Sequence, residues 1–243
     1  MFDKNLYILR RYVSYKVFDL ENLVNKTITL SAPQTFNDPV DTYFYYSPDD
    51  YFIDAKKIMT KEIMDKIRIA CFTNCHDEQK CNRKLTTYEL LLWTHCANAH
   101  KGICLEYEVP SNAFSYIEPN DDYDESKRFI DKISYVSNLA VDYETIFTSS
   151  IKKKNKYNQL LKDVFMTKDD AFQYENEFRL LMYDSTNESH IAFPFNYLRK
   201  IIFGYRCIDV TKHCIFCLNK KIYDSKLELR VINNKFEEVL YNE

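Results

Sequence analysis

The sequence predicts a mixed α/β fold of the α+β kind, with about eight strands in one mixed sheet or in split sheets flanked by helices. Short apolar or β-branched runs alternate along the chain with segments of helical spacing, which is typical of such folds. The 243 residues contain no internal repeat and no flexible linker, so we predict one domain over residues 1–243. Its motifs lie within 6–204, and a C-terminal helix and strand are expected over 209–233.

Strands are expected where an apolar, aromatic or β-branched run is bounded by turn-forming residues. These runs are 5–13, 27–31, 67–73, 102–109, 130–136, 177–183, 191–193, 198–203 and 227–232. Helices are expected where apolar residues recur every three or four positions. The expected helices are 20–25, 50–66, 87–99, 152–173 and 209–218. Asp19 is expected to cap the first of them.

Glycine is scarce in this chain, and its scarcity excludes two kinds of nucleotide site. Only Gly102 and Gly204 occur, whereas a Walker loop and a dinucleotide fingerprint each need more glycines. A bound nucleotide would therefore be held by side chains and by the ends of helices or strands. Gly102 itself is expected either to adopt a left-handed turn conformation or to let a ligand approach the backbone.

Charge and hydropathy point to a cytoplasmic protein without membrane contact. The formal net charge is −3, and no apolar run approaches the ~20 residues that span a bilayer. The eight cysteines are expected to be thiols. Cys214 and Cys217 have a zinc-like spacing, but with Val210 and Leu218 they form an ordinary core stripe of a predicted helix. We therefore expect no metal.

The segment 92–107 is the most informative, because it places reactive polar groups among residues that should face a core. It holds the only tryptophan, Trp93, and two histidines, His95 and His100. His95 borders the predicted apolar stripe of its helix, and it is either a core histidine bonded to a carbonyl or a base that faces a pocket. The predicted stripe consists of Tyr88, Leu91, Leu92, Cys96 and Ala99.

Two further clusters carry carboxylates. In Phe36-Asn37-Asp38-Pro39-Val40-Asp41, the polar residues either shape a turn or place Asp38 or Asp41 against a ligand. In Tyr174-Glu175-Asn176-Glu177-Phe178-Arg179, a strand from 177 puts Glu177 and Arg179 on one face. That pair is either a surface ion pair or the lining of a cleft.

Two arginines interrupt the first apolar strand. Successive strand residues point to opposite faces, so Arg10 and Arg11 are expected to face different sides. Either one is exposed while the other bridges to a carboxylate, or one of them binds a phosphate or carboxylate of a ligand.

Several of these motifs, taken in order, resemble a bacterial family known as domain of unknown function 2971. One departure is Cys96, where tyrosine is expected in many relatives. The segments that carry the resemblance are Leu6-Tyr7 with Arg10, Phe36-Asn37-Asp38-Pro39 with Asp41, Cys71-Phe72-Thr73, Leu92-Trp93-Thr94-His95, His100-Lys101-Gly102-Ile103-Cys104-Leu105-Glu106, Tyr174-Glu175 with Glu177 and Arg179, and Ile201-Ile202-Phe203-Gly204.

The layout of that family also resembles the ADP-ribosyltransferase superfamily. The resemblance implies that NAD is a co-substrate, that Arg10 holds its pyrophosphate, and that Glu177 bonds the nicotinamide ribose. His95 completes the implied catalytic set, and Trp93 or Phe36 would stack on nicotinamide. The remaining implied ligand contacts are Tyr7, Asn37, Asp38, Asp41, His100, Lys101, Glu175 and Arg179.

Three functions are open at this point. The first is an NAD-dependent transferase or glycohydrolase acting as a toxin or phage-defence effector, with a protein or nucleic acid as acceptor. The second is a non-catalytic sensor or partner-binding module, which the high aromatic content also suits. The third is a metal-dependent hydrolase or nuclease that uses Asp38, Asp41, Glu175 and Glu177.

Overall fold

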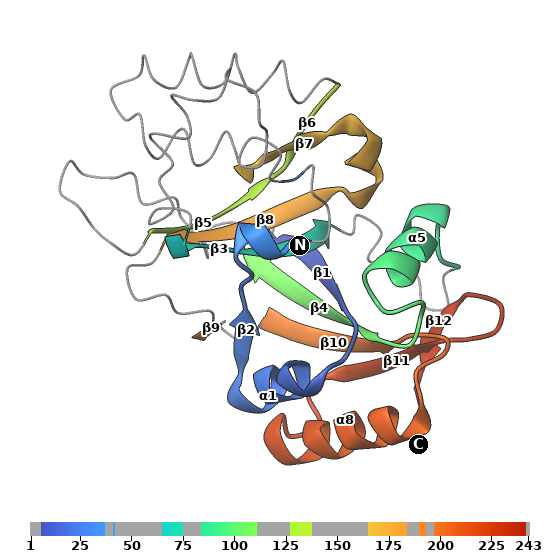
Figure 1. The fold of residues 1–243 in the computed structure, drawn as a ribbon. Coiled ribbons are helices and arrows are strands. Elements are labelled where there is room, and N and C mark those ends of the chain that lie inside the picture. Colours follow the sequence, from blue (N-terminus) through green and yellow to red (C-terminus); the bar gives the residue numbers. More distant parts are fainter. Residues whose placement is uncertain are drawn as a thin grey trace, which may run out of the picture. The chain divides into compact units, whose positions relative to one another are not determined.

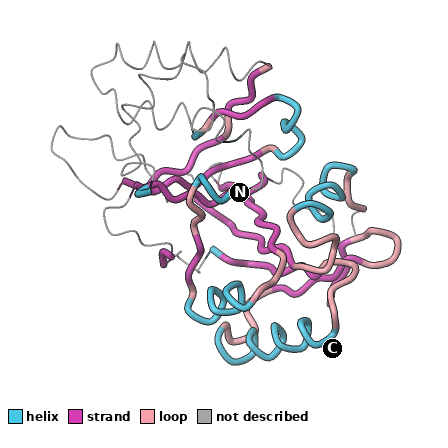
Figure 2. The backbone as a smooth tube through the Cα atoms, viewed as in Figure 1, coloured by secondary structure: helices cyan, strands magenta, loops and turns pink. Residues whose placement is uncertain are grey.

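The chain divides by its contacts into two compact units. The first consists of Met1–Ile28, Phe72–Ala113 and Ile191–Glu243, and the second of Thr29–Cys71 and Phe114–His190. The expectation of a single domain stays a prediction. The elements are labelled in Figure 1 and coloured by type in Figure 2. This computed structural model describes residues 6–36, 41, 65–74, 84–110, 127–137, 165–183, 190–192 and 197–241.

The predicted fold class is confirmed, because the described residues form a mixed sheet with few helices. Eight strands are hydrogen-bonded in the order β12-β11-β10-β4-β1-β3-β8-β5. The first five lie in the first unit, β3 (Ile67–Asn74) is divided between the units, and β8 (Glu177–Tyr183) and β5 (Lys127–Lys132) lie in the second. We describe each unit by itself.

In the first unit, β4 (Ile103–Pro110) is the central strand. It runs antiparallel to β1 (Leu6–Val13) and to β10 (Leu198–Phe203). A parallel strand, β11 (Glu228–Ile232), follows β10, and β12 (Glu238–Leu240) forms the edge. Every residue of β4 from 103 to 107 is buried, as expected for a strand covered on both faces.

Three helices cover the strands of the first unit. α5 (Thr87–His95), with the turn that follows it, packs through Trp93 and Ala97 onto apolar side chains that include Cys104 and Ile202. In Figure 1, α1 (Val17–Asn25) and α8 (Asp209–Ile222) lie together on the other side of β10 and β11. A hydrogen bond joins the ends of α8 and α1, because the hydroxyl of Tyr223 donates to the carbonyl of Leu23 at 2.6 Å.

The second unit holds β5 and β8 as an antiparallel pair, together with a small parallel sheet of β6 (Ser134–Val136) and β7 (Thr167–Asp169). The 3-10 helix η4 (Asp170–Glu175) connects β7 to β8. Three short elements complete the described chain: β2 (Thr27–Thr29), η1 (Pro33–Thr35) and β9 (His190–Ala192), with β2 paired to β9.

Several predicted boundaries were wrong. Asp19 does not precede its helix but lies in the first turn, where its carboxylate accepts the Lys16 N–H at 2.6 Å. The expected strand 130–136 is broken at Ile133, whose N–H bonds the carbonyl of Glu177. Residues 167–173, expected to end a helix, form β7 and most of η4. Most of the expected helix 50–66, and residues 152–164, lie outside the described residues. β12 was not predicted.

Both predicted helix stripes were wrong by one position. α5 buries Glu89, Leu92 and Trp93, while Tyr88 and Leu91 face solvent. The cause is Glu89, which takes an apolar position because it pairs with Arg10. α8 likewise buries Thr211, Ile215, Leu218 and Asn219 in place of Val210 and Cys214.

A left-handed turn ends α5 four residues before the predicted end. Asn98, Ala99 and His100 have φ angles of 50°, 52° and 68°, which costs L residues roughly 1–2 kcal/mol each. Both glycines of the chain pack against this turn, and neither has a positive φ. A Cβ on Gly204 would lie 2.2 Å from the His100 carbonyl oxygen, and one on Gly102 would lie 2.0 Å from that of Val13. Glycine is required here for close backbone contact.

Within the described residues, no helix is both long and apolar enough to cross a membrane.

Substitution at the left-handed turn should change stability in opposite directions at neighbouring positions. Gly204→Ala forces a methyl group into the His100 carbonyl and should lower the free energy of unfolding by about 3 kcal/mol or more. Ala99→Gly removes the left-handed strain and should raise it by up to about 1 kcal/mol. Urea unfolding measures both changes, and an unchanged midpoint for Gly204→Ala would contradict the close contact.

Candidate functional site

A cluster of five charged side chains, four of them buried, occupies the second unit. Glu177 and Arg179 stand on the same face of β8, as the alternation of strand side chains predicted, and Arg179 Nε donates to Glu177 Oε1 at 2.7 Å. Arg179 Nη2 also donates to Asp41 Oδ1 at 2.7 Å. Lys168, on β7, places its ammonium 2.7 Å from Glu175, 3.3 Å from Asp41 and 3.4 Å from Glu177. Of the two alternatives for Glu177 and Arg179, the surface ion pair is therefore wrong, because both side chains are buried.

A local turn brings the two glutamates to the same ammonium. η4 ends at Glu175, and Asn176 then takes a left-handed conformation with a φ of 44° before β8 begins at Glu177. Asparagine tolerates this conformation better than most residues. The reversal at Asn176 lets Glu175 and Glu177 both reach Lys168.

Neighbouring groups fix the position of Glu177 and Arg179. The backbone N–H of Glu177 donates to the hydroxyl oxygen of Tyr135 at 2.8 Å. Arg179 Nη1 donates to the Phe165 carbonyl at 2.9 Å, and its guanidinium lies 5.5 Å from the centre of the Phe36 ring. With these partners Arg179 is fully buried without an unmatched charge.

The environment pushes the pKa values of the two glutamates apart. Burial by itself would raise the pKa of Glu177, but the charges of Arg179 and Lys168 outweigh it and lower the pKa to about 2. Burial raises the pKa of Glu175, and the opposing charge of Lys168 does not cancel that effect. Glu177 is therefore ionised throughout the neutral range, whereas Glu175 is the group better suited to exchange a proton.

Glu175 is also the most accessible member of the cluster. Its side chain is 18% exposed, whereas those of Asp41, Lys168 and Glu177 are 4–6% exposed. The three carboxylates exceed the two cations by one charge. Protonation of Glu175 would make the cluster neutral, which agrees with the direction of its pKa shift.

A second buried network surrounds Arg10 in the first unit. Its guanidinium bonds Glu106 at 2.6 Å, Glu89 at 3.0 Å and Glu238 at 3.0 Å. Arg10 and Glu106 are directly opposed on β1 and β4, and Lys200 of β10 is opposed to Glu106 on its other side. Arg10 would have to leave a carboxylate in order to bind the pyrophosphate of NAD. Its geometry here is that of a residue that holds strands and a helix together.

The other predicted site residues of the first unit do not gather around Arg10. Trp93 is 1% exposed, in a T-shaped contact with Tyr12 and stacked on His100. His95 is exposed at the end of α5, so the interpretation as a core histidine was wrong. Lys101 is exposed, as is Tyr7 near the start of β1.

The predicted site residues are thus found in both units. Phe36, Asp41, Glu175, Glu177 and Arg179 come together in the second unit. Arg10, Trp93, His95, His100, Lys101 and Tyr7 belong to the first. The convergence of Arg10 and His95 with Glu177 stays a prediction, and Asn37 and Asp38 lie outside the described residues.

Sequence reasoning missed Lys168, Tyr135 and Cys71. Lys168 was hidden because β7 has only three residues, too few to show an alternating pattern, and because the region was expected to be helical. The thiol of Cys71 forms a hydrogen bond with Glu177. The pKa of that thiol is raised mainly by burial and, to a smaller extent, by the negative charge of Glu177. Cys71 lies in one of the segments that resemble the family, but no local signal placed Cys71, Lys168 or Tyr135 at the site.

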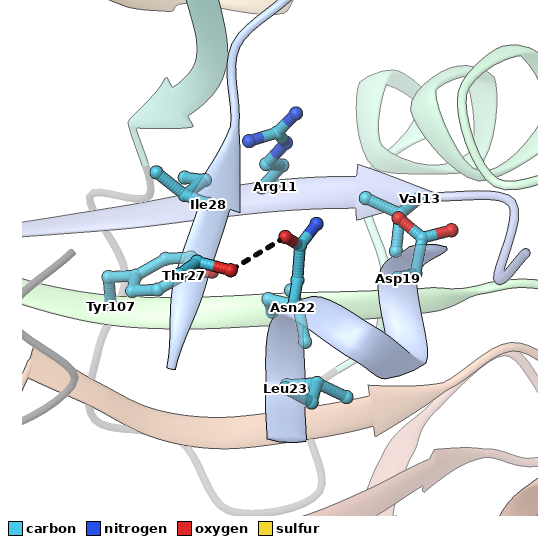
Figure 3. A pocket seen from close by; sticks show the side chains of 9 residues that line it. Arg11, Val13, Asp19, Asn22, Leu23, Thr27, Ile28 and Tyr107 are labelled. Carbon is cyan, nitrogen blue, oxygen red and sulfur yellow. Dashed lines mark hydrogen bonds between the residues drawn. The ribbon is translucent and has the colours of Figure 1, made fainter. Parts of the chain in front are cut away.

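A small cavity in the first unit cannot serve as a cofactor site. It lies between α1, β2 and the strands β1 and β4, with Arg11, Asp19 and Asn22 in its wall (Figure 3). Its volume of about 10 Å³ suits at most one water molecule, whereas ligand pockets measure roughly 300–1,000 Å³. Arg11 thus faces the side opposite to Arg10, as predicted.

Comparison with known proteins supports one part of the resemblance. Residues 92–180 match the model of the family described as "Protein of unknown function (DUF2971)". The matched segment includes Trp93, His95 and His100 and also Lys168, Glu175, Glu177 and Arg179, but neither Arg10 nor Asp41. No curated protein and no solved structure gave a match to the chain. The likeness to the ADP-ribosyltransferase superfamily stays a prediction.

The Arg10 network should make stability depend on pH through Glu106. Burial alone would raise the pKa of Glu106, but Arg10, Lys200 and Arg199 lower it from 4.5 to about 2. A lowered pKa stabilises the folded state above the unfolded value, and this stabilisation is lost as the pH falls from about 4.5 towards 2. Its size is roughly 3 kcal/mol.

Glu106→Gln should therefore unfold more easily than the parent protein at pH 7, and the difference should shrink as the pH falls below about 4.5. Urea titrations at several pH values measure this difference. Glu108→Gln is the matched control, because Glu108 lies on the same strand with a side chain 42% exposed and should contribute under about 1 kcal/mol. A difference for Glu106→Gln that does not vary with pH would contradict the assignment.

Proposed function

We propose that this chain breaks the N-glycosidic bond of NAD and transfers ADP-ribose to water or to a nucleophilic group of a protein or nucleic acid. The observation that carries the proposal is the pair of glutamates around Lys168, whose pKa values are shifted in opposite directions. One ionised and one proton-exchanging carboxylate are the groups that glycosyl transfer uses.

Glu177 would stabilise the transition state. As the bond between ribose C1′ and nicotinamide breaks, nicotinamide leaves with the electron pair and positive charge develops on the ribose. A carboxylate held ionised by Arg179 and Lys168 and aimed at that charge needs little reorganisation. Glu177 now accepts a hydrogen bond from the thiol of Cys71, the weakest of its donors, and the ribose hydroxyl would take the place of that thiol.

Glu175 would act as the general base. The acceptor's O–H or N–H attacks C1′, and its proton passes to the Glu175 carboxylate. The raised pKa and greater exposure of Glu175 suit this role, because a base is most effective when its pKa lies nearer the working pH. Bond making and bond breaking then balance without any further reactant.

The metal-dependent alternative has less support. Asp41, Glu175 and Glu177 do gather in one place, but the ammonium of Lys168 already lies among them and compensates part of their charge. Among the described residues, no group of three His, Cys, Asp or Glu side chains is arranged to hold a metal ion.

Nicotinamide release from NAD is the direct test. The protein is incubated with NAD, alone and with bacterial lysate, and nicotinamide is quantified by chromatography. Glu177→Gln should reduce release by about 10²-fold or more, because it removes the charge that faces the transition state. Asp170→Asn, at the exposed start of η4, is the matched control and should leave release unchanged. Absence of release from the parent protein in both conditions would refute the proposal.

The pH profile separates the two glutamates. Release by the parent protein should rise with pH through the raised pKa of Glu175, because a base must be ionised to act. Glu175→Gln should lower the rate and remove this acid limb, whereas loss of structure alone would lower the rate at every pH. Circular dichroism of each variant checks folding, and a folded Glu177→Gln variant with full activity would overturn the role of Glu177.

A further inference from the structure

Three turns of the first unit meet at one end of its sheet. They are 98–102 before β4, 204–207 after β10, and 233–236 between β11 and β12. β4 runs antiparallel to β10, and β10 runs parallel to β11, so the start of β4 and the ends of β10 and β11 coincide. Figure 1 shows the segment after α5 reaching the strand ends beside the β11–β12 hairpin.

Backbone hydrogen bonds join the first two turns to each other and fix the third to the segment before α5. The N–H of Arg206 donates to the carbonyl of His100 at 2.9 Å, and the N–H of Gly204 donates to the carbonyl of Gly102 at 3.0 Å. The carbonyl of Phe236 accepts from the N–H of Leu85, just before α5, at 2.9 Å. The strained left-handed residues thus belong to a rigid surface rather than to a loose loop, and strain of this kind is concentrated at functional positions.

A row of aromatic rings runs from the core to this surface. His100 stacks on buried Trp93 with ring centroids 6.0 Å apart and an angle of 13° between the planes. Phe236 lies 6.0 Å from His100, and Tyr205 lies 5.7 Å from Phe236. Tyr205 and Phe236 are 45% and 36% exposed, so the row ends in rings that solvent can reach.

The same turns carry only positive charge. Lys101, Arg206 and Lys235 are all exposed, and residues 98–102, 204–207 and 233–236 contain no aspartate or glutamate, although the chain as a whole has a net charge of −3. Within the described part of the chain, no carboxylate forms an ion pair with any of these three cations. As far as the described residues are concerned, their charge is therefore available to an external anion.

We propose that this surface, formed by residues 98–102, 204–207 and 233–236, binds single-stranded nucleic acid. Exposed aromatic rings stack on unpaired bases, and the surrounding cations attract the phosphates. A duplex hides its base faces, so it would use only the cations. An acidic peptide would use the cations as well, but it would gain little from Tyr205 and Phe236. The combination of rings and cations therefore favours a single strand.

Fluorescence anisotropy with labelled 12-mers tests the proposal. Single-stranded DNA and RNA should bind more tightly than the duplex of the same sequence at 50 mM salt. Tyr205→Ala should weaken single-strand binding at least about 5-fold, while Tyr205→Phe, which keeps the ring, should bind like the parent protein. Tyr205 is exposed, so neither change should unfold the protein.

Salt dependence provides a second, independent readout. Loss of one phosphate contact lowers the slope of log affinity against log salt by about 0.7 for a single strand. Arg206→Ala should show this reduction. Lys221→Ala should not, because Lys221 is also exposed but lies near the far end of α8, ~18 Å from the start of that helix.

Three results would overturn the proposal. The first is no binding of either single strand at low salt, and the second is a duplex that binds as well as or better than a single strand. The third is equal binding of labelled poly-glutamate with no effect of Tyr205→Ala, which would indicate an acidic protein partner. Because NAD is absent from these experiments, their outcome is distinct from that of the nicotinamide assay.

Discussion

The described structure depends on two buried arginines, Arg10 and Arg179, each of which forms ion pairs with more than one carboxylate. Arg10 links β1 to β4, α5 and β12 through Glu106, Glu89 and Glu238. Removing one partner from such a network leaves a charge without compensation in a medium of low polarity, which costs roughly 3–5 kcal/mol. The network therefore fixes which elements are neighbours, although an apolar core of the same shape could be equally stable. It also explains why α5 buries a glutamate where an apolar residue was expected.

The cluster around Arg179 obeys the same rule but differs in one respect. Arg10 bonds three carboxylates in the first unit, whereas the second cluster includes the more exposed Glu175, whose pKa burial raises. Above its pKa, a carboxylate whose pKa is raised in the folded state lowers the stability of that state. That cost is the physical reason to assign chemistry to the second cluster and a structural role to the first.

The left-handed turn after α5 shows how two glycines can serve one feature. Asn98, Ala99 and His100 adopt a conformation that glycine would adopt more easily, yet the glycines lie at the positions where other backbone segments approach. The chain therefore retains side chains on the strained residues, among them the imidazole of His100 stacked on Trp93. Residues with side chains thus occupy the strained left-handed positions, and glycine occupies the positions where a neighbouring carbonyl leaves no room for a Cβ.

The sequence by itself determined the fold class and most strands, because the alternation or continuity of apolar residues is a local property. β1, β3, β4, β8 and β10 lie within one or two residues of their predicted limits, and the shared face of Glu177 and Arg179 followed from strand alternation. Two of the three-residue strands, β7 and β12, were missed, because so short a strand shows no clear period, although β2 and β9 were predicted. The exact faces of α5 and α8 were also missed, since polar residues with distant partners occupy buried positions in both.

Only the tertiary structure decided which charges pair. Arg10 binds residues that lie 79, 96 and 228 positions away in the chain, and Arg179 binds one that lies 138 positions away. A sequence pattern can indicate the face on which a charged side chain stands, but it carries no information on the partner that compensates the charge. The roles of Arg10 and Lys168 depend on that partner, and so they could be assigned only once the strands and helices had been brought together.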